Sequence, residues 1–336
     1  MAEHVNSRIL GMGHHVPEHV VTNDDLSRCM DTTDEWIQQR TGIRQRHFVD
    51  RHAGPADLAL PAAREALRSA GVRPDDLDLI VLGTLSPDVD FPGSASFLQR
   101  GLGAKGMPVM DVRNQCSGFI YMLAVADAFI RTGGAWRVLI VGAEVHSSGL
   151  DLTTTGREVS VIFGDGAGAA VLGPSSDPER GVLSTHLHSE GKFAEKLMVE
   201  VPTSRCAPRV TEAMVDGPGS RLWPRMEGRY VFKHAVTRFP EVIQEALDAN
   251  GLTVADIDLF IPHQANLRIS QMVAGGLGLP DEKVFNNIDR YGNTTAGSIP
   301  IALHEAIQAG RVRDGNLVCL AAFGSGFTWG AALVRW

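Results

Sequence analysis

Hydrophobic residues recur along the chain with two different periods, which together predict alternating strands and helices. Short apolar runs rich in Val, Ile and Leu predict strands at residues 79–82, 138–141, 169–172, 259–261 and 317–321. Apolar positions spaced three or four residues apart predict helices at residues 56–70, 119–131, 230–250, 268–275 and 298–309. Strands that alternate with helices are typical of an α/β protein, so we expect an α/β fold.

One helix-and-strand pattern occurs twice, at residues 64–81 and again at residues 244–261. Each copy has an amphipathic helix, a glycine that ends it, a polar connection and an apolar strand, and the offset is a constant 180 residues. Later segments are echoed in the same order. The duplication predicts two pseudo-symmetric halves, residues 1–174 and 175–336, with a site where they meet. A proline-rich stretch at about 190–227 reads as a long insertion into the second half, and loops of this length are usually functional.

Composition narrows the class of protein. The net charge of −8 argues against general affinity for nucleic acid, and no apolar run reaches the roughly 18 residues that a membrane span needs. The first eight residues contain no apolar signal core. The four cysteines lie far apart, which fits reduced thiols rather than a disulfide framework. We expect a cytoplasmic protein that binds neither nucleic acid nor a membrane.

Two further patterns argue against a bound cofactor or metal. Residues 101–106 match G-x-G-x-x-G, but a helix precedes them and a strand follows, the reverse of the dinucleotide-binding order, so they read as a helix stop. His14, His15 and His19, and the histidines of residues 186–188, have no Cys or carboxylate at metal-ligand spacing. We expect neither a cofactor nor a metal.

Cys116 is the candidate nucleophile. Residues 108–119 read as a buried strand, a tight elbow carrying the cysteine, and the start of a helix. A thiol at a helix N-terminus faces free backbone N–H groups and the positive end of the helix dipole, which favour the thiolate. The alternative is a small buried residue where a strand packs on a helix.

His263 and Asn293 are the candidate hydrogen-bond donors. His263 directly follows a predicted strand of the second half, at the carboxyl end where α/β proteins build their sites. Asn293 lies before a helix, at nearly the place that Cys116 holds in the first half. An imidazole and a carboxamide can both donate to one oxygen that carries developing negative charge. Each residue alone would more often be structural, but the three together favour an enzyme.

At these residues the sequence resembles β-ketoacyl-acyl carrier protein synthase III, of the thiolase superfamily. The similarity covers nearly the whole chain and rests on several segments together: residues 31–36, 40–44, 116–119, 163–168, 263–269, 292–294 and 324–330. The resemblance implies a thiolase-like fold, with the two halves packed in a layered α-β-α-β-α arrangement.

The resemblance also implies an acyltransferase mechanism. Cys116 would take an acyl group from acyl-CoA as a thioester, and His263 and Asn293 would promote decarboxylation of a malonyl thioester by stabilising the enolate oxygen. The carbanion would then attack the acyl-enzyme. The backbone N–H groups of Cys116 and Ser325 would form the oxyanion hole.

Further residues match positions that bind substrates and partners in this family. The CoA adenine and phosphates would be held by Thr32, Trp36, Arg40 and Arg157. Phe91 matches a residue lent across a dimer interface to the partner's acyl pocket, so the resemblance implies a homodimer.

The surface for an acidic acyl carrier protein would keep Lys233 and Arg268. The chain departs from the family at Gly275 and Gly276, where two lysines are common, so malonyl-CoA stays open as the acceptor. Gln115 and Ser117 also stand where alanines are more usual, and the glycine loop carries Ser325 between two glycines.

Three functions follow as hypotheses. The main one is a synthase that starts fatty acid synthesis from a short acyl-CoA and malonyl-carrier protein. The first alternative is a condensing enzyme of secondary metabolism, of the alkylquinolone or polyketide-starter type, with another acyl donor or malonyl-CoA. The second is an inert scaffold or acyl-binding protein on the same fold.

Overall fold

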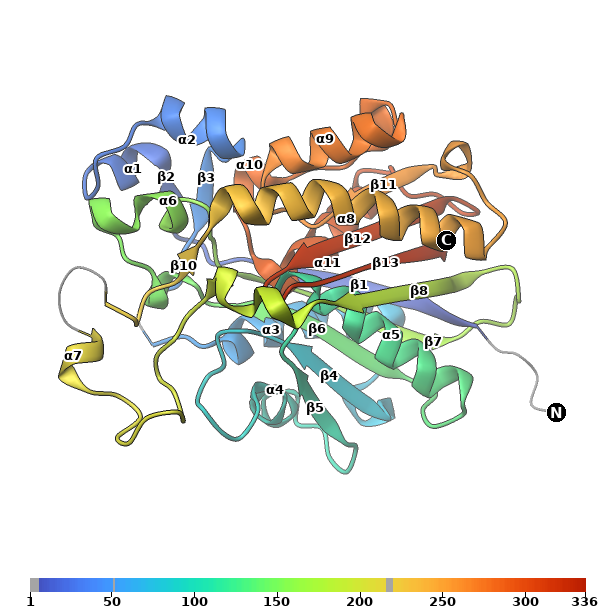
Figure 1. Cartoon of the computed structure of the whole chain (residues 1–336). Helices are drawn as coiled ribbons and strands as arrows, with labels where there is room; N and C mark the ends of the chain where they lie inside the picture. The colour runs from blue at the N-terminus through green and yellow to red at the C-terminus, as the bar shows by residue number, and fades with distance from the viewer. Residues whose placement is uncertain (1–5, 51, 216–219) are drawn as a thin grey trace.

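Two β-sheets organise the chain in the computed structural model, which describes residues 6–50, 52–215 and 220–336 (Figure 1). The first sheet has the order β1-β7-β6-β4-β5, with the bounds Ser7–His15, Gly166–Pro174, Val138–Glu144, Leu79–Gly83 and Val109–Val112. The second has the order β11-β12-β13-β8, with the bounds Leu259–Pro262, Leu317–Gly324, Thr328–Arg335 and Gly181–Ser189. Both are mixed sheets: β4 is parallel to β5 and β6, and β11 to β12, while β7 and β13 pair antiparallel with their neighbours.

Three layers of helices enclose the two sheets. The longer helices are α3 (Pro55–Ala70), α4 (Ser94–Leu102), α5 (Gly118–Arg131), α8 (Gly228–Ala249), α9 (Leu267–Leu277) and α11 (Ser298–Gln308). The shorter ones are α1 (Asn23–Ser27), α2 (Asp34–Thr41), α6 (Arg157–Ser160), α7 (Glu212–Val215) and α10 (Ile288–Tyr291). Helices α5 and α11 are buried between the sheets, α3 and α4 cover the first sheet and α8 and α9 the second. The predicted α-β-α-β-α layering is therefore confirmed.

Apolar side chains on both faces hold the central layer in place. Phe119 of α5 and Leu303 of α11 pack in one core cluster with Ile140 of the first sheet and Leu320 of the second, and all four are essentially inaccessible to solvent. Burying a side chain of this size contributes roughly 1.5–3 kcal/mol. Helices that are apolar on two sides, as α5 is, suit a position between two sheets.

The duplicated pattern has the same backbone in both copies. Gly71 follows α3 and Gly251 follows α8, and each has a φ of +64°, where a side chain would be strained. Gly103, within the G-x-G-x-x-G match, ends α4 at a φ of +72°, so that match is a helix stop as predicted. The strands of the first sheet come from residues 7–174 and those of the second from residues 181–335. The domain boundary at residue 174 stays a prediction.

The strand before Cys116 is not buried as expected. Residues 109–112 form β5, the edge strand of the first sheet, and Asp111 is exposed. The Asp111 carboxylate accepts hydrogen bonds from the backbone N–H groups of Ser94 (2.6 Å) and Ala95 (2.9 Å) at the start of α4. An edge strand that caps a neighbouring helix needs only one apolar face, which is why the prediction was wrong.

The described part of the insertion at residues 190–227 (190–215 and 220–227) contains little regular structure: a 3-10 turn at Gly191–Lys196, α7, and the two-residue strands β9 (Leu197–Met198) and β10 (Arg225–Met226). Glu190 and Phe327 exchange two backbone hydrogen bonds of 2.8 and 3.1 Å. The Ser325 hydroxyl donates to the Leu197 carbonyl at 2.5 Å. The insertion is thus fastened to the glycine-containing loop at residues 324–328.

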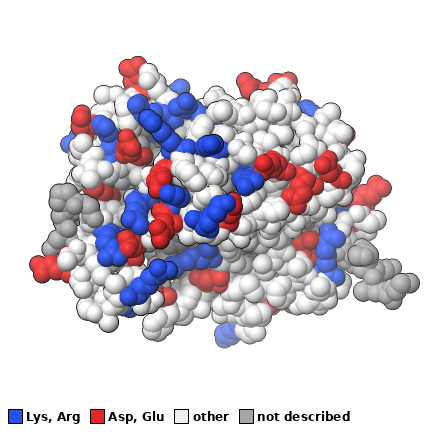
Figure 2. Space-filling model, in the orientation of Figure 1, with Lys and Arg blue, Asp and Glu red and all other residues white. Residues whose placement is uncertain are grey.

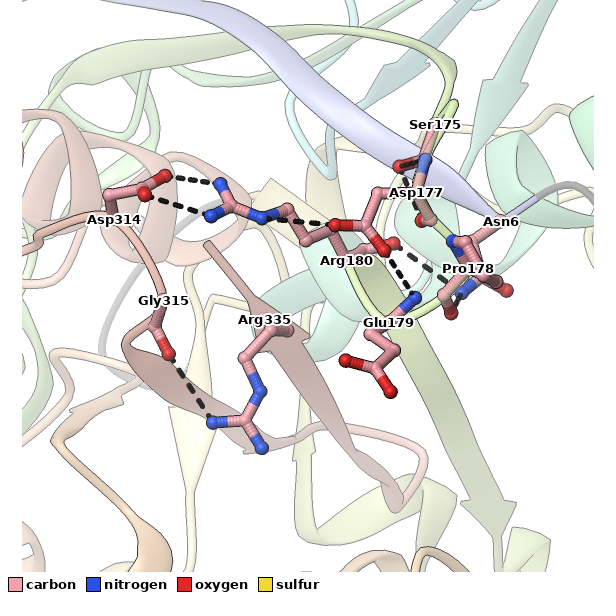
Figure 3. A network of polar contacts seen from close by, with 9 residues as sticks. All are labelled: Asn6, Ser175, Asp177, Pro178, Glu179, Arg180, Asp314, Gly315 and Arg335. Carbon is pink, nitrogen blue, oxygen red and sulfur yellow. Dashed lines mark hydrogen bonds and ion pairs between the residues drawn. The ribbon is translucent and has the colours of Figure 1, made fainter.

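The connection between the sheets, from β7 to β8, is held at the surface (Figure 3). Both terminal nitrogens of the Arg180 guanidinium contact the Asp314 carboxylate, with Nη2 at 2.8 Å from Oδ2. The Asn6 side-chain amide donates to the Pro178 carbonyl at 2.6 Å. Exposed pairs of this kind contribute at most about 1 kcal/mol. Within the described residues, no helix combines the length and the apolar character that crossing a membrane requires.

Candidate active site

Cys116 lies where the two sheets meet the central helices. It occupies the 3-10 turn Gln115–Ser117 between β5 and α5, and it is 6% exposed. Gln115 has a φ of +41°, an uncommon conformation for a residue with a side chain, and such positions often belong to functional sites. From the other half, Gly324 at the end of β12 comes so close that an added Cβ would lie 2.7 Å from the Cys116 Cβ. Gly324 therefore has to be glycine.

The Cys116 thiol is protonated at neutral pH, contrary to the expectation from the sequence. Burial, together with the nearby Glu144 carboxylate, raises its pKa to about 12. The backbone N–H groups of Cys116 and Ser325 and the side chain of Asn293 lower the pKa by smaller amounts. The expectation was wrong because the cysteine sits in an enclosed turn one step before α5, where loss of water outweighs the helix terminus.

His263 has one ring nitrogen fixed and the other free. Its Nδ1 lies 2.6 Å from the Ser298 hydroxyl, which also accepts from the Gln264 backbone N–H at 3.4 Å. When that hydroxyl donates its proton to Nδ1, the neutral ring carries its own proton on Nε2. The Nε2 atom is buried and has no partner among the described residues. Burial lowers the pKa of His263 to about 3, so the ring is a neutral donor at Nε2.

Asn293 is oriented in the same way. Its Oδ1 accepts from the Thr295 backbone N–H at 2.8 Å, which leaves the Nδ2 hydrogens free to donate. Its own backbone exchanges hydrogen bonds with residues 162 and 164 of the first half, at 2.9 and 3.1 Å. Its side chain interacts with Cys116. The structure therefore brings Cys116, Asn293 and the Ser325 backbone together.

Two residues of this site were missed by the sequence reasoning. Ser298, the first residue of α11, fixes His263 as described above. Glu144, at the end of β6, is fully buried and accepts from the Ser86 hydroxyl (2.8 Å) and the Leu85 backbone N–H (3.1 Å). Burial raises the pKa of Glu144 to about 7. A carboxylate at the carboxyl end of a buried strand was the available signal, because α/β sites form there.

The site thus combines a thiol with the Asn293 amide, and Ser298, directly after the turn Thr295–Gly297, holds a second neutral side chain, His263. A buried thiol that keeps its proton attacks a thioester only as that proton leaves. The Nε2–H of His263 and the Nδ2–H of Asn293 suit an oxygen that gains negative charge. Among the described residues, neither has a carboxylate hydrogen-bond partner that would make it a strong base, so the geometry fits enolate stabilisation better than proton abstraction.

The predicted CoA residues lie together on α2, α6 and the turn before α2. Two guanidinium groups pack against the Trp36 indole, whose ring centroid lies 4.2 Å from the Arg40 Cζ and 4.9 Å from the Arg157 Cζ. The Thr32 hydroxyl and the Arg157 Nε are buried without a hydrogen-bond partner among the described residues. An aromatic face beside unsatisfied donors is suited to a stacked base and phosphates.

The predicted partner contacts lie on the surface. Phe91 is 81% exposed, which is unusual for a large apolar side chain. Lys233 on α8 and Arg268 on α9 are exposed, and so are Gly275 and Gly276. In Figure 2, Lys and Arg side chains gather on the left of this face, over α2, α8 and the insertion, with Asp and Glu among them.

Two regions of the chain match a known protein family. Residues 110–191 match the family described as 3-Oxoacyl-[acyl-carrier-protein (ACP)] synthase III, and residues 247–336 match the C-terminal region of the same family. The first match contains Cys116, and the second contains His263 and Asn293.

Individual relatives extend the similarity to the whole chain. Beta-ketoacyl-acyl-carrier-protein synthase III of Xanthomonas campestris pv. campestris is 48% identical over 336 residues, 100% of both chains. The protein of that name from Rhodospirillum centenum is 48% identical over 99% of both. The solved 3-oxoacyl-acyl-carrier-protein synthase III of Aquifex aeolicus is 44% identical, with a TM-score of 0.89 over 98% of this chain and 100% of the other. The chain belongs to the β-ketoacyl-acyl-carrier-protein synthase III family of condensing enzymes.

Proposed function

We propose that this condensing enzyme joins a short acyl group, delivered as an acyl-CoA, to malonyl-acyl carrier protein, and so starts fatty acid synthesis. The observation that carries the proposal is the buried set of Cys116, His263 and Asn293, with one thiol and two donors of fixed orientation. The proposal gives each of them one step.

Cys116 performs the acyl transfer. Its sulfur attacks the thioester carbonyl of acyl-CoA, the carbonyl oxygen takes the negative charge, and the backbone N–H groups of Cys116 and Ser325 donate to that oxygen. Collapse of the intermediate breaks the carbon–sulfur bond to CoA, which leaves as the thiol with the proton that Cys116 loses. The same backbone groups lower the pKa of the buried thiol, which supports their direction toward the sulfur and the reacting carbonyl.

His263 and Asn293 promote the second step. Both donate to the thioester oxygen of the malonyl group while its carboxylate leaves as CO₂ and the electron pair forms an enolate. The enolate carbon then attacks the acyl-enzyme carbonyl, the carbon–sulfur bond to Cys116 breaks as the product forms, and the released thiolate takes up one proton from solvent. Low exposure of both donors, 4% each, strengthens their hydrogen bonds to the enolate oxygen.

Substrate and partner contacts complete the proposal. Trp36, Arg40, Arg157 and Thr32 hold the CoA nucleotide, and Lys233 and Arg268 receive the acidic carrier protein. The exposed Phe91 completes the acyl pocket of a second copy in a homodimer, and burial there accounts for its apolar character. The enzyme works in the cytoplasm, which suits four cysteines that are all free.

A secondary-metabolism role is the second candidate. The priming β-ketosynthase of the R1128 polyketide biosynthetic pathway is 33% identical, with a TM-score of 0.89 over 100% of this chain and 98% of the other. Gly275 and Gly276 favour this candidate, because they remove positive charge from the side of α9 where a carrier protein would dock. The higher identity to the β-ketoacyl-acyl-carrier-protein synthases III named above, 44–48% against 33%, supports the main proposal.

Intact-protein mass spectrometry after incubation with a panel of acyl-CoAs tests the proposal. We expect a mass gain with acetyl or a short branched acyl group, and none in Cys116→Ala. Selective acylation by long-chain or aromatic donors would favour the secondary-metabolism role. Absence of acylation by every donor, with the chain folded, would contradict both.

A further inference from the structure

Two histidines and a glutamate from three separate elements meet at the edge of the first sheet. His14 is on β1, the outer strand, Glu65 is on α3 and His304 is on α11. Helices α3 and α11 cover opposite faces of this sheet. Side chains from helices on opposite faces of a sheet can meet only past its edge strand. The small residues of β1 and β7 allow both helices to pack close to the sheet. An added Cβ on Gly13 would lie 2.6 Å from the Glu65 Cβ.

The three side chains point their ligand atoms at one small volume. The Nδ1 atoms of His14 and His304 are 2.7 Å apart, and the His304 Nδ1 is 3.9 Å from the Glu65 Oε2. One ring nitrogen from each histidine and one carboxylate oxygen of Glu65 all lie within 4.8 Å of one another. Oε2 also accepts from the His14 backbone N–H at 2.8 Å, which holds the carboxylate in place.

Glu65 lacks a permanent positive partner, unlike its neighbour. Among the described residues, no Lys or Arg lies within ion-pair distance of Glu65. Glu305, the next residue after His304, is instead occupied by Arg290, Tyr291 and Asn287 at 2.6–2.8 Å. The Glu65 side chain is 35% exposed while that of His304 is 9% exposed, so the cluster is open to solvent on the side of the carboxylate.

We propose that His14, Glu65 and His304 form a binding site for a divalent transition metal, with Zn²⁺ as the best-suited ion. Two imidazoles and one carboxylate are a ligand set that Zn²⁺ accepts, and a water molecule from the open side completes four ligands. Imidazole nitrogen disfavours Mg²⁺ and Ca²⁺, which prefer oxygen. The site is distinct from the catalytic one and does not rest on the proposed function.

Binding of Zn²⁺ requires only small movements of the two histidine side chains, and each neutral ring keeps its single proton. Zn–N bonds of about 2.0–2.1 Å at a tetrahedral angle separate the two nitrogens by about 3.3 Å. The Nδ1 atoms must therefore move apart by about 0.6 Å, which side-chain rotation supplies. The ring that now donates from Nδ1 moves its proton to Nε2. On His304, Nε2 faces the Gln308 side-chain amide at 3.4 Å, whose oxygen can accept that proton once the amide is turned.

A second histidine pair on the same molecule provides the matched control. His186 and His188 also contact one glutamate, Glu245, but each ring bonds to a different carboxylate oxygen, at 3.1 and 2.6 Å. In that pair the carboxylate stands between the rings and both of its oxygens are occupied. A hydrogen-bonded arrangement of this kind leaves no common point for an ion.

Visible absorption during titration of the purified full chain with Co²⁺, followed by competition with Zn²⁺, tests the proposal. We expect one equivalent of Co²⁺ to give the d–d band of a four-coordinate site, and Zn²⁺ to remove it. Glu65→Gln and His304→Ala should weaken binding by at least about 100-fold, since even outer contacts of metal sites are worth 10–100-fold. His186→Ala should bind like the unaltered chain, and Cys116→Ala should do the same if the active-site thiol is not a ligand.

Three results would overturn the proposal. They are an absence of a Co²⁺ band in the unaltered chain, a band that survives both Glu65→Gln and His304→Ala, and a band lost equally in His186→Ala. The first would mean that the two imidazoles share a proton and bind no ion. Because His304 is buried, circular dichroism should be used to confirm that His304→Ala folds. If His304→Ala does not fold, Glu65→Gln tests the proposal alone, because Glu65 is partly exposed and its variant should fold.

Discussion

The two halves of the molecule contain the same turn, and only one of them carries the nucleophile. The turns Gln115–Ser117 and Thr295–Gly297 are 180 residues apart, and each leads directly into a central helix, α5 or α11. Gln115 has a φ of +41° and Thr295 a φ of +42°. The strained backbone is therefore a property of the repeated fold and not of the cysteine.

The side chains differ because the surroundings differ. Ala296 takes the position of Cys116, and it is packed so closely that an added Cβ on Gly142 would lie 2.1 Å from its carbonyl oxygen. The Ala296 side chain faces Gly118 of the first half, where an added Cβ would lie 3.1 Å from the Ala296 Cβ. The second half contributes the two donors instead. Asn293 lies just before the turn Thr295–Gly297, and His263 is held by Ser298, which lies just after it. The comparison teaches that the duplicated fold has two turns of the same backbone conformation, of which one carries the thiol and the other lies between the residues that supply the donors.

Removing the histidine should have the largest effect. His263→Ala takes away a buried donor to the enolate oxygen, and loss of one such donor costs about 10²–10³-fold in rate. We expect decarboxylation of a malonyl thioester to fall by that factor, measured as CO₂ release. His19→Ala, which removes an exposed histidine, is the control and should leave the rate unchanged. Undiminished decarboxylation in His263→Ala would show that the second half does not supply this donor.

Glu144 interacts with both turns, with Cys116 of the first and with Thr295 of the second. Its pKa is raised from 4.5 to about 7 in the folded protein. The stability that its protonated form contributes is complete below about pH 4.5 and is lost as the pH rises through 7, about 3 kcal/mol in all.

Glu144→Gln should remove this loss. We expect the free energy of unfolding of the variant, relative to the unaltered chain, to rise by about 3 kcal/mol between pH 4.5 and pH 8, measured by urea unfolding at each pH. Glu18→Gln, at an exposed position, controls for the substitution itself. If the stability of Glu144→Gln and of the unaltered chain depended on pH in the same way, the pKa of Glu144 would not be raised by its burial between the two turns.

A smaller effect should follow from Ser298. Ser298→Ala leaves the imidazole in place but removes the hydroxyl that keeps its proton on Nε2, and one such hydrogen bond is worth about tenfold in rate. We expect kcat for condensation to fall about tenfold with KM nearly unchanged, and Ser298→Thr to restore part of it. A variant whose KM rises while kcat is kept would argue that Ser298 only shapes the pocket.

Much of the fold could be predicted because its elements are long and strongly periodic. The strands at Leu79, Val138, Leu259 and Leu317 and the central helices lie within a few residues of their predicted bounds. Periodicity and glycine stops act over neighbouring residues, so the sequence carries them directly. The short segments before residue 50 have no such signal, and the edge position of β5 depends on strand order, which no local pattern specifies.

The site was partly predictable for a related reason. Cys116, His263 and Asn293 follow strands or precede helices at pseudo-equivalent ends, which the repeat made visible. The high pKa of Cys116, the role of Ser298 and the burial of Glu144 arise from contacts across the two halves. The cluster of His14, Glu65 and His304 was overlooked because its members come from three distant segments, and ligand spacing along one segment was the criterion.

The most direct test of a divided site measures both half-reactions in two variants. Acyl-enzyme formation can be followed by intact mass, and malonyl decarboxylation by CO₂ release, in Cys116→Ala and in Asn293→Ala. We expect Cys116→Ala to lose the acyl-enzyme while it still decarboxylates, and Asn293→Ala to form the acyl-enzyme while decarboxylation falls about 10²–10³-fold. If both half-reactions fell together in either variant, the assignment of one step to each half would be wrong.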